Sequence, residues 1–132
     1  MIKLVYLIAK RQDLSAEAFH TLWADVHAKL AHELSDTLGA QRYVMTKALN
    51  TLCNMCVAKG RDLPENRYDG VIEMWWDSLG AYQMGAGSAQ GIVAVDALID
   101  AERRFIDFSK SAAFFAEEEE AFAHAKRRKH AA

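Results

Sequence analysis

The chain has 132 residues, of which 52% are hydrophobic and 26% are charged, and its formal net charge is −2. This length and composition predict one globular domain that needs no metal or disulfide for its core, and the near-balanced charge gives no reason to expect a nucleic-acid partner. No run approaches the roughly 20 apolar residues of a membrane span, and no secretory signal is evident. We therefore expect a cytoplasmic protein with free cysteines and no membrane partner.

The first predicted elements are a strand and a long helix. Residues 2–10 are rich in β-branched and large apolar side chains, and the run is too short for a buried helix. Ser15 follows a polar break and is placed to cap a helix over residues 16–38, in which apolar side chains recur at helical spacing. Gly39 stands where a glycine commonly ends a helix.

Two further strands are predicted, with a loop between them. Residues 41–49 alternate well enough for a strand, and residues 69–77 form the third strand. Residues 50–67 show no periodicity and contain the only proline. They predict a long loop, a kind of segment that is often functional or disordered.

Two shorter helices should follow the third strand. Asp77 or Ser78 is placed to cap a short helix that runs to about Met84. Ser88 is placed to cap a further helix, whose apolar residues mark a mixed face.

The last part of the domain is expected to hold an irregular segment, a strand and a tail. Residues 105–111 are irregular, and residues 113–119 predict the fourth strand. We expect one domain over residues 1–119 and a charged tail over 120–132 that is helical or disordered. The basic run 126–129 resembles a nucleic-acid patch, but a solvated tail is the favoured interpretation because the rest of the chain is not basic.

The order of elements is that of an α+β, ferredoxin-like domain. It reads β-α-β-β-α-β and predicts a four-stranded antiparallel sheet with helices on one face. The third strand is apolar on both sides, with Ile72, Met74 and Trp76 on one side and Val71 and Trp75 on the other. Two helices cannot cover both faces, so we expect the second face to pack against another copy in a homodimer.

Several short segments, taken in order over roughly residues 1–119, resemble the EthD family. They are residues 1–6, 19–23, 26–28, 67–75, 88–91, 104–107 and 109–111. The resemblance implies that the homodimer closes into an α/β barrel around an apolar pocket. It also implies kinship with cyclases, dehydratases, isomerases and cofactor-free monooxygenases that act on aromatic or polyketide-like molecules. The second strand departs from the family, because Met45 and Lys47 stand where members often carry amide or histidine side chains.

His27 is the first candidate catalytic residue. It lies beside the apolar stripe of the predicted helix, and a histidine can take or give a proton near neutral pH. The alternative is a half-buried histidine that bonds a backbone carbonyl. The match to the family at Trp23-x-x-x-His27 favours a catalytic role.

Glu73 is the second candidate. Alternation along the third strand places it with Val71 and Trp75, where burial among aromatic side chains would raise its pKa and suit it to acid–base work. The alternative is an ion pair with Lys47 or an arginine that holds the dimer together.

Tyr6, Tyr43 and Lys47 are expected to share the face of Glu73 and to line the pocket. Tyr43 and Lys47 are four residues apart on one strand, so both point the same way, and together they could steady a developing enolate oxygen. Packing for the tyrosines and exposure for the lysine are the ordinary alternatives. Four apolar residues are candidate pocket walls, although core packing is the commoner role of each: Met45, Trp75, Phe105 and Phe108.

The sequence predicts no metal and no cofactor. Cys53 and Cys56 have the CxxC spacing, but a structural zinc site needs four ligands and no second pair accompanies them. A glycine-rich phosphate loop and a dinucleotide fingerprint are also missing from the sequence.

The sequence is consistent with three functions. The first is a cofactor-independent dehydratase, cyclase or isomerase that acts on an aromatic or polyketide-like hydrophobic substrate, with catalytic His27 assisted by Glu73 or Tyr43. The second is a cofactor-free monooxygenase on the same scaffold. The third is a non-catalytic protein that binds a small hydrophobic ligand.

Overall fold

The computed structural model describes residues 1–125 and shows a single four-stranded sheet. The strands are β1 (Ile2–Ile8), β2 (Arg42–Lys47), β3 (Gly70–Trp76) and β4 (Ala112–Ala116). They lie in the order β2-β3-β1-β4, and every neighbouring pair is antiparallel. This confirms the α+β, ferredoxin-like fold, in which the first and third strands are central.

The predicted first helix is one helical run with irregular internal geometry. It comprises α1 (Ala16–Thr21), the π-helical segment η1 (Leu22–Ala28), α2 (Lys29–Glu33) and α3 (Ser35–Leu38). Ser15 accepts a hydrogen bond from the backbone N–H of Ala18, so the predicted cap is confirmed. Gly39 ends the run with φ 74°, a left-handed conformation that glycine adopts without strain.

The predicted loop between β2 and β3 is wrong in part, because it contains a helix. This helix is α4 (Leu52–Lys59), whose N-cap position is Thr51. Its residues lack a buried face, and no residue of the helix is buried. The sequence pattern missed α4 because a helix that packs against nothing shows no apolar stripe.

The later helices follow the predicted order. They are α5 (Leu79–Gly87), α6 (Ala89–Glu102) and the short 3-10 turn η2 (Phe108–Lys110). Ser78 and Ser88 cap α5 and α6 by accepting backbone N–H groups. The fourth strand is shorter than predicted, and residues 117–125 carry neither helix nor strand. In the predicted tail over 120–132, residues 120–125 are therefore not helical, and residues 126–132, which include the basic run 126–129, lie outside the described residues.

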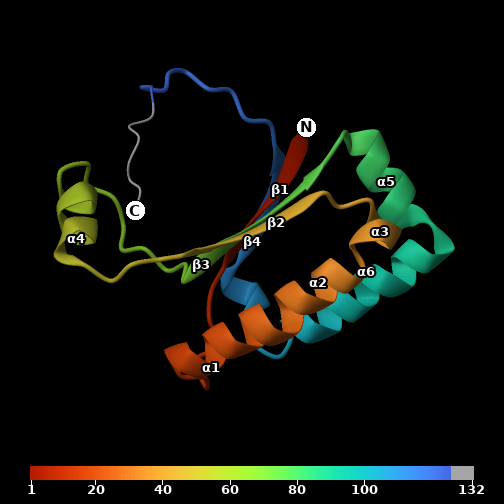
Figure 1. Cartoon of the computed structure of the whole chain (residues 1–132). Helices are drawn as coiled ribbons and strands as arrows, with labels where there is room; N and C mark the ends of the chain where they lie inside the picture. The colour runs from red at the N-terminus through yellow and green to blue at the C-terminus, as the bar shows by residue number, and fades with distance from the viewer. Residues whose placement is uncertain (126–132) are drawn as a thin grey trace.

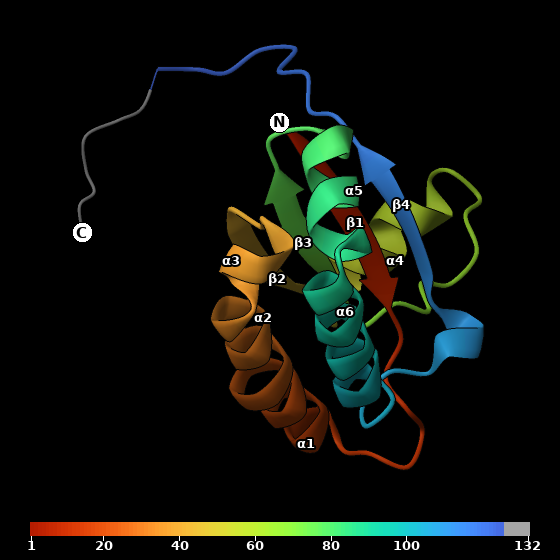
Figure 2. The ribbon, with the colours of Figure 1, turned by 90° about the vertical axis from the view of Figure 1, so that its right-hand side faces the viewer.

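The core lies between one face of the sheet and the helices. Figures 1 and 2 show the run α1–α3 and the pair α5–α6 on the same side of the sheet. The largest fully buried side chains are those of Trp23, Phe105, Ile8, Ile72 and His27, and His27 is the polar member of that set. A buried histidine therefore stands in the middle of an apolar core.

The opposite face of the sheet has no helix packed on it among residues 1–125 (Figure 1). We call it the bare face. Cross-strand pairing assigns to it Val5 of β1, Glu73 and Trp75 of β3, Val44 of β2 and Phe114 of β4. The predicted two-sided apolar character of the third strand is confirmed, since Ile72 is 1% exposed on one face and Trp75 is 8% exposed on the other. No helix within residues 1–125 has the length and apolar character of a membrane span.

Candidate active site

His27 is hydrogen-bonded through both ring nitrogens. The residue is 2% exposed. Its Nδ1 lies 2.8 Å from the Tyr43 hydroxyl and its Nε2 lies 2.9 Å from Glu102 Oε2. Trp23 Nε1 donates to the same hydroxyl over 3.0 Å, so the proton of that hydroxyl is directed at His27. His27 Nδ1 therefore accepts a hydrogen bond from the Tyr43 hydroxyl, and Nε2 carries the ring proton and donates a hydrogen bond to Glu102.

Tyr6 completes the arrangement by donating its hydroxyl proton to Glu102 Oε1 over 3.1 Å. We call these five residues the His27 network: Tyr6, Trp23, His27, Tyr43 and Glu102. Trp23, Tyr43 and His27 form one path of donors that ends on Glu102, and Tyr6 donates to the same carboxylate separately. No buried side-chain nitrogen or oxygen among residues 1–125 lacks a hydrogen-bond partner, so the network is internally satisfied.

The segment η1 gives the network its two helical members. Trp23 and His27 lie four residues apart on this π-helical stretch, and both are buried. π-Helical turns are rare and occur frequently at functional sites. Residues four apart lie on one side of a helical run, so the ring nitrogens of both side chains reach the same Tyr43 hydroxyl on β2.

Two elements distant in sequence supply the accepting carboxylate and its second donor. Glu102 is the last residue of α6, and its side chain is 12% exposed. Tyr6 stands on the central strand β1, directly opposite Ile72 of β3. The carboxylate is thus fixed between α6 and the sheet, where it can stabilise positive charge on His27.

Burial keeps both tyrosines protonated. For Tyr43 the pKa is raised well above its ordinary value, mainly by burial and further by the charge of Glu102, while the hydrogen bond from Trp23 opposes the rise. For Tyr6 the pKa is also raised, by burial first and then by the charge and hydrogen bond of Glu102. Tyr43 is accordingly a proton donor at neutral pH and not a free phenolate.

The surroundings of the imidazole are apolar. The ring of Phe105 meets that of His27 edge-on at 5.8 Å between centroids, and Phe105 is fully buried. Tyr43 is half-buried and stands on the edge strand β2. An acid–base group in such a site is screened from water by the apolar core.

The predicted grouping of Glu73 with Tyr6, Tyr43 and Lys47 is wrong. Tyr6 and Tyr43 pair across the sheet with Ile72 and Met74, so they face the helices, whereas Glu73 faces the other way. The sheet therefore separates Glu73 from the His27 network. Its ion-pair partner is also different from the predicted Lys47 or arginine, because Lys3 Nζ lies 2.6 Å from Glu73 Oε2.

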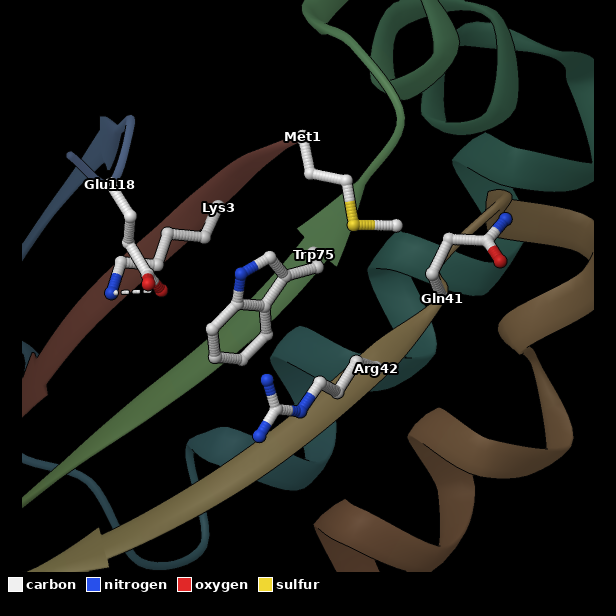
Figure 3. Close-up of a pocket in the computed structure, with 6 residues that line it drawn as sticks. All are labelled: Met1, Lys3, Gln41, Arg42, Trp75 and Glu118. Atoms are coloured by element: carbon white, nitrogen blue, oxygen red, sulfur yellow. Dashed lines mark hydrogen bonds and ion pairs between the residues drawn. The ribbon is translucent and has the colours of Figure 1, made fainter. Parts of the chain in front are cut away.

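Figure 3 shows the part of the bare face around Trp75, lined by Met1, Lys3, Gln41, Arg42, Trp75 and Glu118. The guanidinium carbon of Arg42 lies 4.6 Å from the centre of the Trp75 ring, and Lys3 Nζ lies 5.3 Å from it. Lys3 also bonds Glu118 over 3.1 Å. The hydrogen bond to Glu73, together with that to Glu118 and both charges, raises the pKa of Lys3 against the effect of burial. This hollow is charged and open, and it does not contain His27.

The remaining predicted binding residues are dispersed. Met45 and Phe105 lie on the helix side, where Met45 is half-buried against the core. Trp75 is on the bare face, Lys47 is exposed at the end of β2, and Phe108 is 43% exposed beside η2. Met45, Lys47 and Phe105 share a side of the sheet with His27 and Tyr43, but Lys47 is exposed there.

Sequence reasoning did not assign a role to Glu102 or to the indole N–H of Trp23. In the sequence Glu102 is one charged residue near the end of the predicted helix after Ser88, a signal that names no partner. The predicted contact of His27 with a backbone carbonyl is replaced by side-chain partners from β2 and α6. His27 and Glu102 are 75 positions apart, so tertiary packing brings them together. The periodicity of a local segment cannot predict such a contact.

Comparison with known proteins adds a family and a fold. The EthD domain matches residues 11–109 of this chain. A search of curated proteins finds no match.

Solved structures share the fold at low sequence identity. An ethyl tert-butyl ether D (EthD) family protein from Bacillus halodurans is 18% identical, with a TM-score of 0.62 over 90% of this chain and 99% of that one. A dimeric protein of unknown function and ferredoxin-like fold from Bacteroides fragilis is 12% identical, with a TM-score of 0.55 over 89% and 95%. SnoaB, a cofactor-independent oxygenase from Streptomyces nogalater, is 11% identical, with a TM-score of 0.52 over 93% and 97%. At these identities the likeness concerns the fold.

Proposed function

The chain belongs to the EthD family, and we propose that it is a cofactor-independent enzyme that moves protons on a small hydrophobic substrate of the aromatic or polyketide-like kind. The observation that carries this proposal is the directed hydrogen-bond path from Tyr43 through His27 to Glu102. Such a path makes a buried imidazole a base, because the carboxylate stabilises the imidazolium that forms. Isomerisation, dehydration and ring closure are the reactions that it would support.

The proposed step is a coupled transfer of two protons. A proton leaves an activated carbon of the substrate for the Tyr43 oxygen while the phenolic proton of Tyr43 passes to His27 Nδ1. The electron pair of the broken C–H bond stays on the substrate as an enolate, and the new imidazolium keeps its hydrogen bond to Glu102. Tyr43 never becomes a free phenolate in this step, which is consistent with the raised pKa of its hydroxyl.

The relay then returns its proton in one of three ways. Delivery to a different carbon completes an isomerisation, and delivery to a β-hydroxyl as that group leaves gives water and a double bond. Attack of the enolate carbon on a second carbonyl of the same substrate, with the proton delivered to the new alkoxide, closes a ring. His27 and Tyr43 are the proposed catalytic pair, Glu102 is a positioning residue, and Met45 and Phe105 are proposed apolar walls.

A cofactor-free monooxygenase is the second candidate. It is favoured by the likeness of the fold to SnoaB, a cofactor-independent oxygenase. In that case the same relay would deprotonate a phenolic substrate, and the resulting anion would itself reduce oxygen. Consumption of oxygen with substrate and no added cofactor would distinguish this reaction from the first.

The test starts with a search for a bound ligand in the purified protein. Small molecules that co-purify with the wild-type chain are identified by mass spectrometry, and their conversion by added enzyme is followed. We expect His27→Ala to lose turnover by about 100-fold or more, the usual contribution of a general base. His32→Ala is the matched control, since His32 is exposed on α2 of the same helical run.

Two results would contradict the proposed activity. One is equal turnover by His27→Ala and wild-type protein. The other is a ligand that the wild-type protein binds and returns unchanged, which would favour the non-catalytic binding protein.

We further propose a homodimer that uses the bare face, and a cytoplasmic location. The dimer is supported by the apolar side chains of Val5, Val44 and Phe114 on a face without helices (Figure 1). The location is supported by two free thiols, which persist best in a reducing compartment.

A further inference from the structure

Helix α4 presents two thiols that the proposed enzymatic function does not use. Cys53 and Cys56 are free and exposed. They lie three residues apart on the helix, so both side chains project from the same side of it. In Figure 1 this helix stands beyond the ends of β2 and β3, away from the layer that holds His27.

The helical spacing suits a bridging ion better than a direct bond between the sulfurs. Side chains three apart on a helix have their Cβ atoms roughly 5–6 Å apart. A disulfide requires Cβ atoms about 3.5–4.5 Å apart, so it would distort this turn. When an ion lies between the sulfurs, two metal–sulfur bonds replace the single S–S bond. The Cβ atoms can then keep their helical separation.

The number and kind of ligands select the ion. Within residues 1–125 no group of three or more histidine, cysteine, aspartate or glutamate side chains could hold a metal ion. Zinc takes four ligands in structural sites, so two thiols would fill only half of its coordination positions. Copper(I) is a soft ion that prefers sulfur ligands, and two thiolates in a nearly linear arrangement satisfy it.

We propose that Cys53 and Cys56 bind one copper(I) ion per chain. The reaction is an exchange without electron transfer: two S–H bonds break, two Cu–S bonds form and two protons are released. The bis-thiolate complex carries one negative charge. It would lie on the first turns of α4, where Thr51 makes no side-chain capping bond and the helix dipole favours negative charge.

The surroundings of the pair suit a site that exchanges its ion. Leu52 is 77% exposed and Met55 is 67% exposed, so the neighbours of the thiols leave them open to solvent. An open, two-ligand site can pass its ion to a partner with a third sulfur ligand, because the incoming ligand meets no steric barrier. This inference does not depend on the activity proposed for His27.

The test is a titration of the fully reduced chain with copper(I) alone, without oxygen, in competition with a coloured copper(I) chelator. We expect one equivalent per chain. Cys53→Ser and Cys56→Ser should each weaken binding by about 100-fold or more, because chelation by two tethered ligands is lost. Met55→Leu is the matched control, and it should leave the affinity unchanged.

Three outcomes would overturn the assignment. Either single serine variant could bind copper(I) as tightly as the wild-type chain, or the wild-type chain could take up none. A zinc complex of two chains that outcompetes copper(I) would show a four-thiolate site instead. Circular dichroism of each variant confirms that the chain is folded in every comparison.

Discussion

At the scale of single residues, the central feature is the proton order within the His27 network. The indole of Trp23 donates to the oxygen of Tyr43 and thereby leaves the phenol one direction in which to donate, toward His27. Glu102 then accepts a hydrogen bond from the ring N–H of His27. A buried histidine with a carboxylate on one side and a hydroxyl on the other has the arrangement that activates nucleophiles and bases in unrelated enzymes.

The raised pKa of Tyr43 has a consequence for stability in alkali. In an unfolded chain tyrosine ionises near pH 10. The folded state holds the proton to higher pH, so the stabilisation is fully present below about pH 10 and is lost as the pH rises toward the folded-state pKa. Above about pH 10, one phenol that stays protonated in the folded state lowers the free energy of unfolding by at most about 1.4 kcal/mol per pH unit.

We therefore expect the free energy of unfolding to fall less steeply with pH in Tyr43→Phe than in the wild-type chain. The variant should also start lower, by about 1–3 kcal/mol, because Trp23 and His27 each lose a partner. Urea unfolding between about pH 9 and pH 11 measures both effects, given the unfolded-state ionisation near pH 10. Tyr68→Phe, outside the network, is the control, and equal slopes in all three proteins would contradict this account.

At the scale of elements, much of the fold could be predicted because its signals are local. The caps at Ser15, Ser78 and Ser88 and the glycine at Gly39 act on their own neighbours, and each stands where it was expected. Helix α4 was missed because it packs against nothing. The π-helical form of η1 was missed as well, since apolar spacing does not distinguish a π turn from an α turn.

The packing of α5 against the end of α3 depends on a glycine. A Cβ atom at Gly85 would lie 2.1 Å from the carbonyl oxygen of Leu38, which is backbone and cannot move aside. At Gly87, on the same helix, a Cβ atom would meet nothing within 4 Å. The two positions therefore separate the effect of crowding from that of helix propensity.

We expect Gly85→Ala to lower the free energy of unfolding by about 1–3 kcal/mol, the usual cost of overpacking. Gly87→Ala should be neutral or should stabilise the chain by up to about 1 kcal/mol. Urea unfolding followed by tryptophan fluorescence measures both variants. A loss in Gly87→Ala as large as that in Gly85→Ala would show that the close approach to Leu38 is not the cause.

At the scale of the whole molecule, the two faces of the sheet have different surroundings. The sequence patterns correctly indicated that β3 is apolar on both sides, yet they assigned the candidate residues to one shared pocket. The register of the strands divides them, with Tyr6 and Tyr43 toward the helices and Glu73 and Trp75 toward the bare face. A shift of one residue reverses the direction of every side chain in a strand, so relative register decides which candidates can meet.

This division makes the proposed site independent of the proposed dimer. The His27 network is complete within one chain, whereas the bare face is the part that would meet a second copy. Loss of the dimer should therefore leave the proton relay intact.

We expect Phe114→Asp to convert the dimer into a monomer. Phe114 is 51% exposed on β4 and faces away from the helices, so a buried carboxylate at this position would oppose pairing of two bare faces. Val93→Asp is the control, because Val93 is 69% exposed on α6. Sedimentation velocity reports the assembly, and a wild-type chain that is monomeric at micromolar concentration would contradict the proposed dimer.

The most direct test of the proposed base is the transfer of solvent deuterium into a substrate carbon. Wild-type protein and Tyr43→Phe are incubated in deuterated buffer near neutral pH with an enolisable aromatic β-diketone, and the label is followed by NMR, with His32→Ala as a control. The account predicts exchange by the wild-type and His32→Ala proteins and a loss of about 100-fold in Tyr43→Phe at unchanged binding. Equal exchange by Tyr43→Phe, or binding without exchange by the wild-type protein, would contradict it.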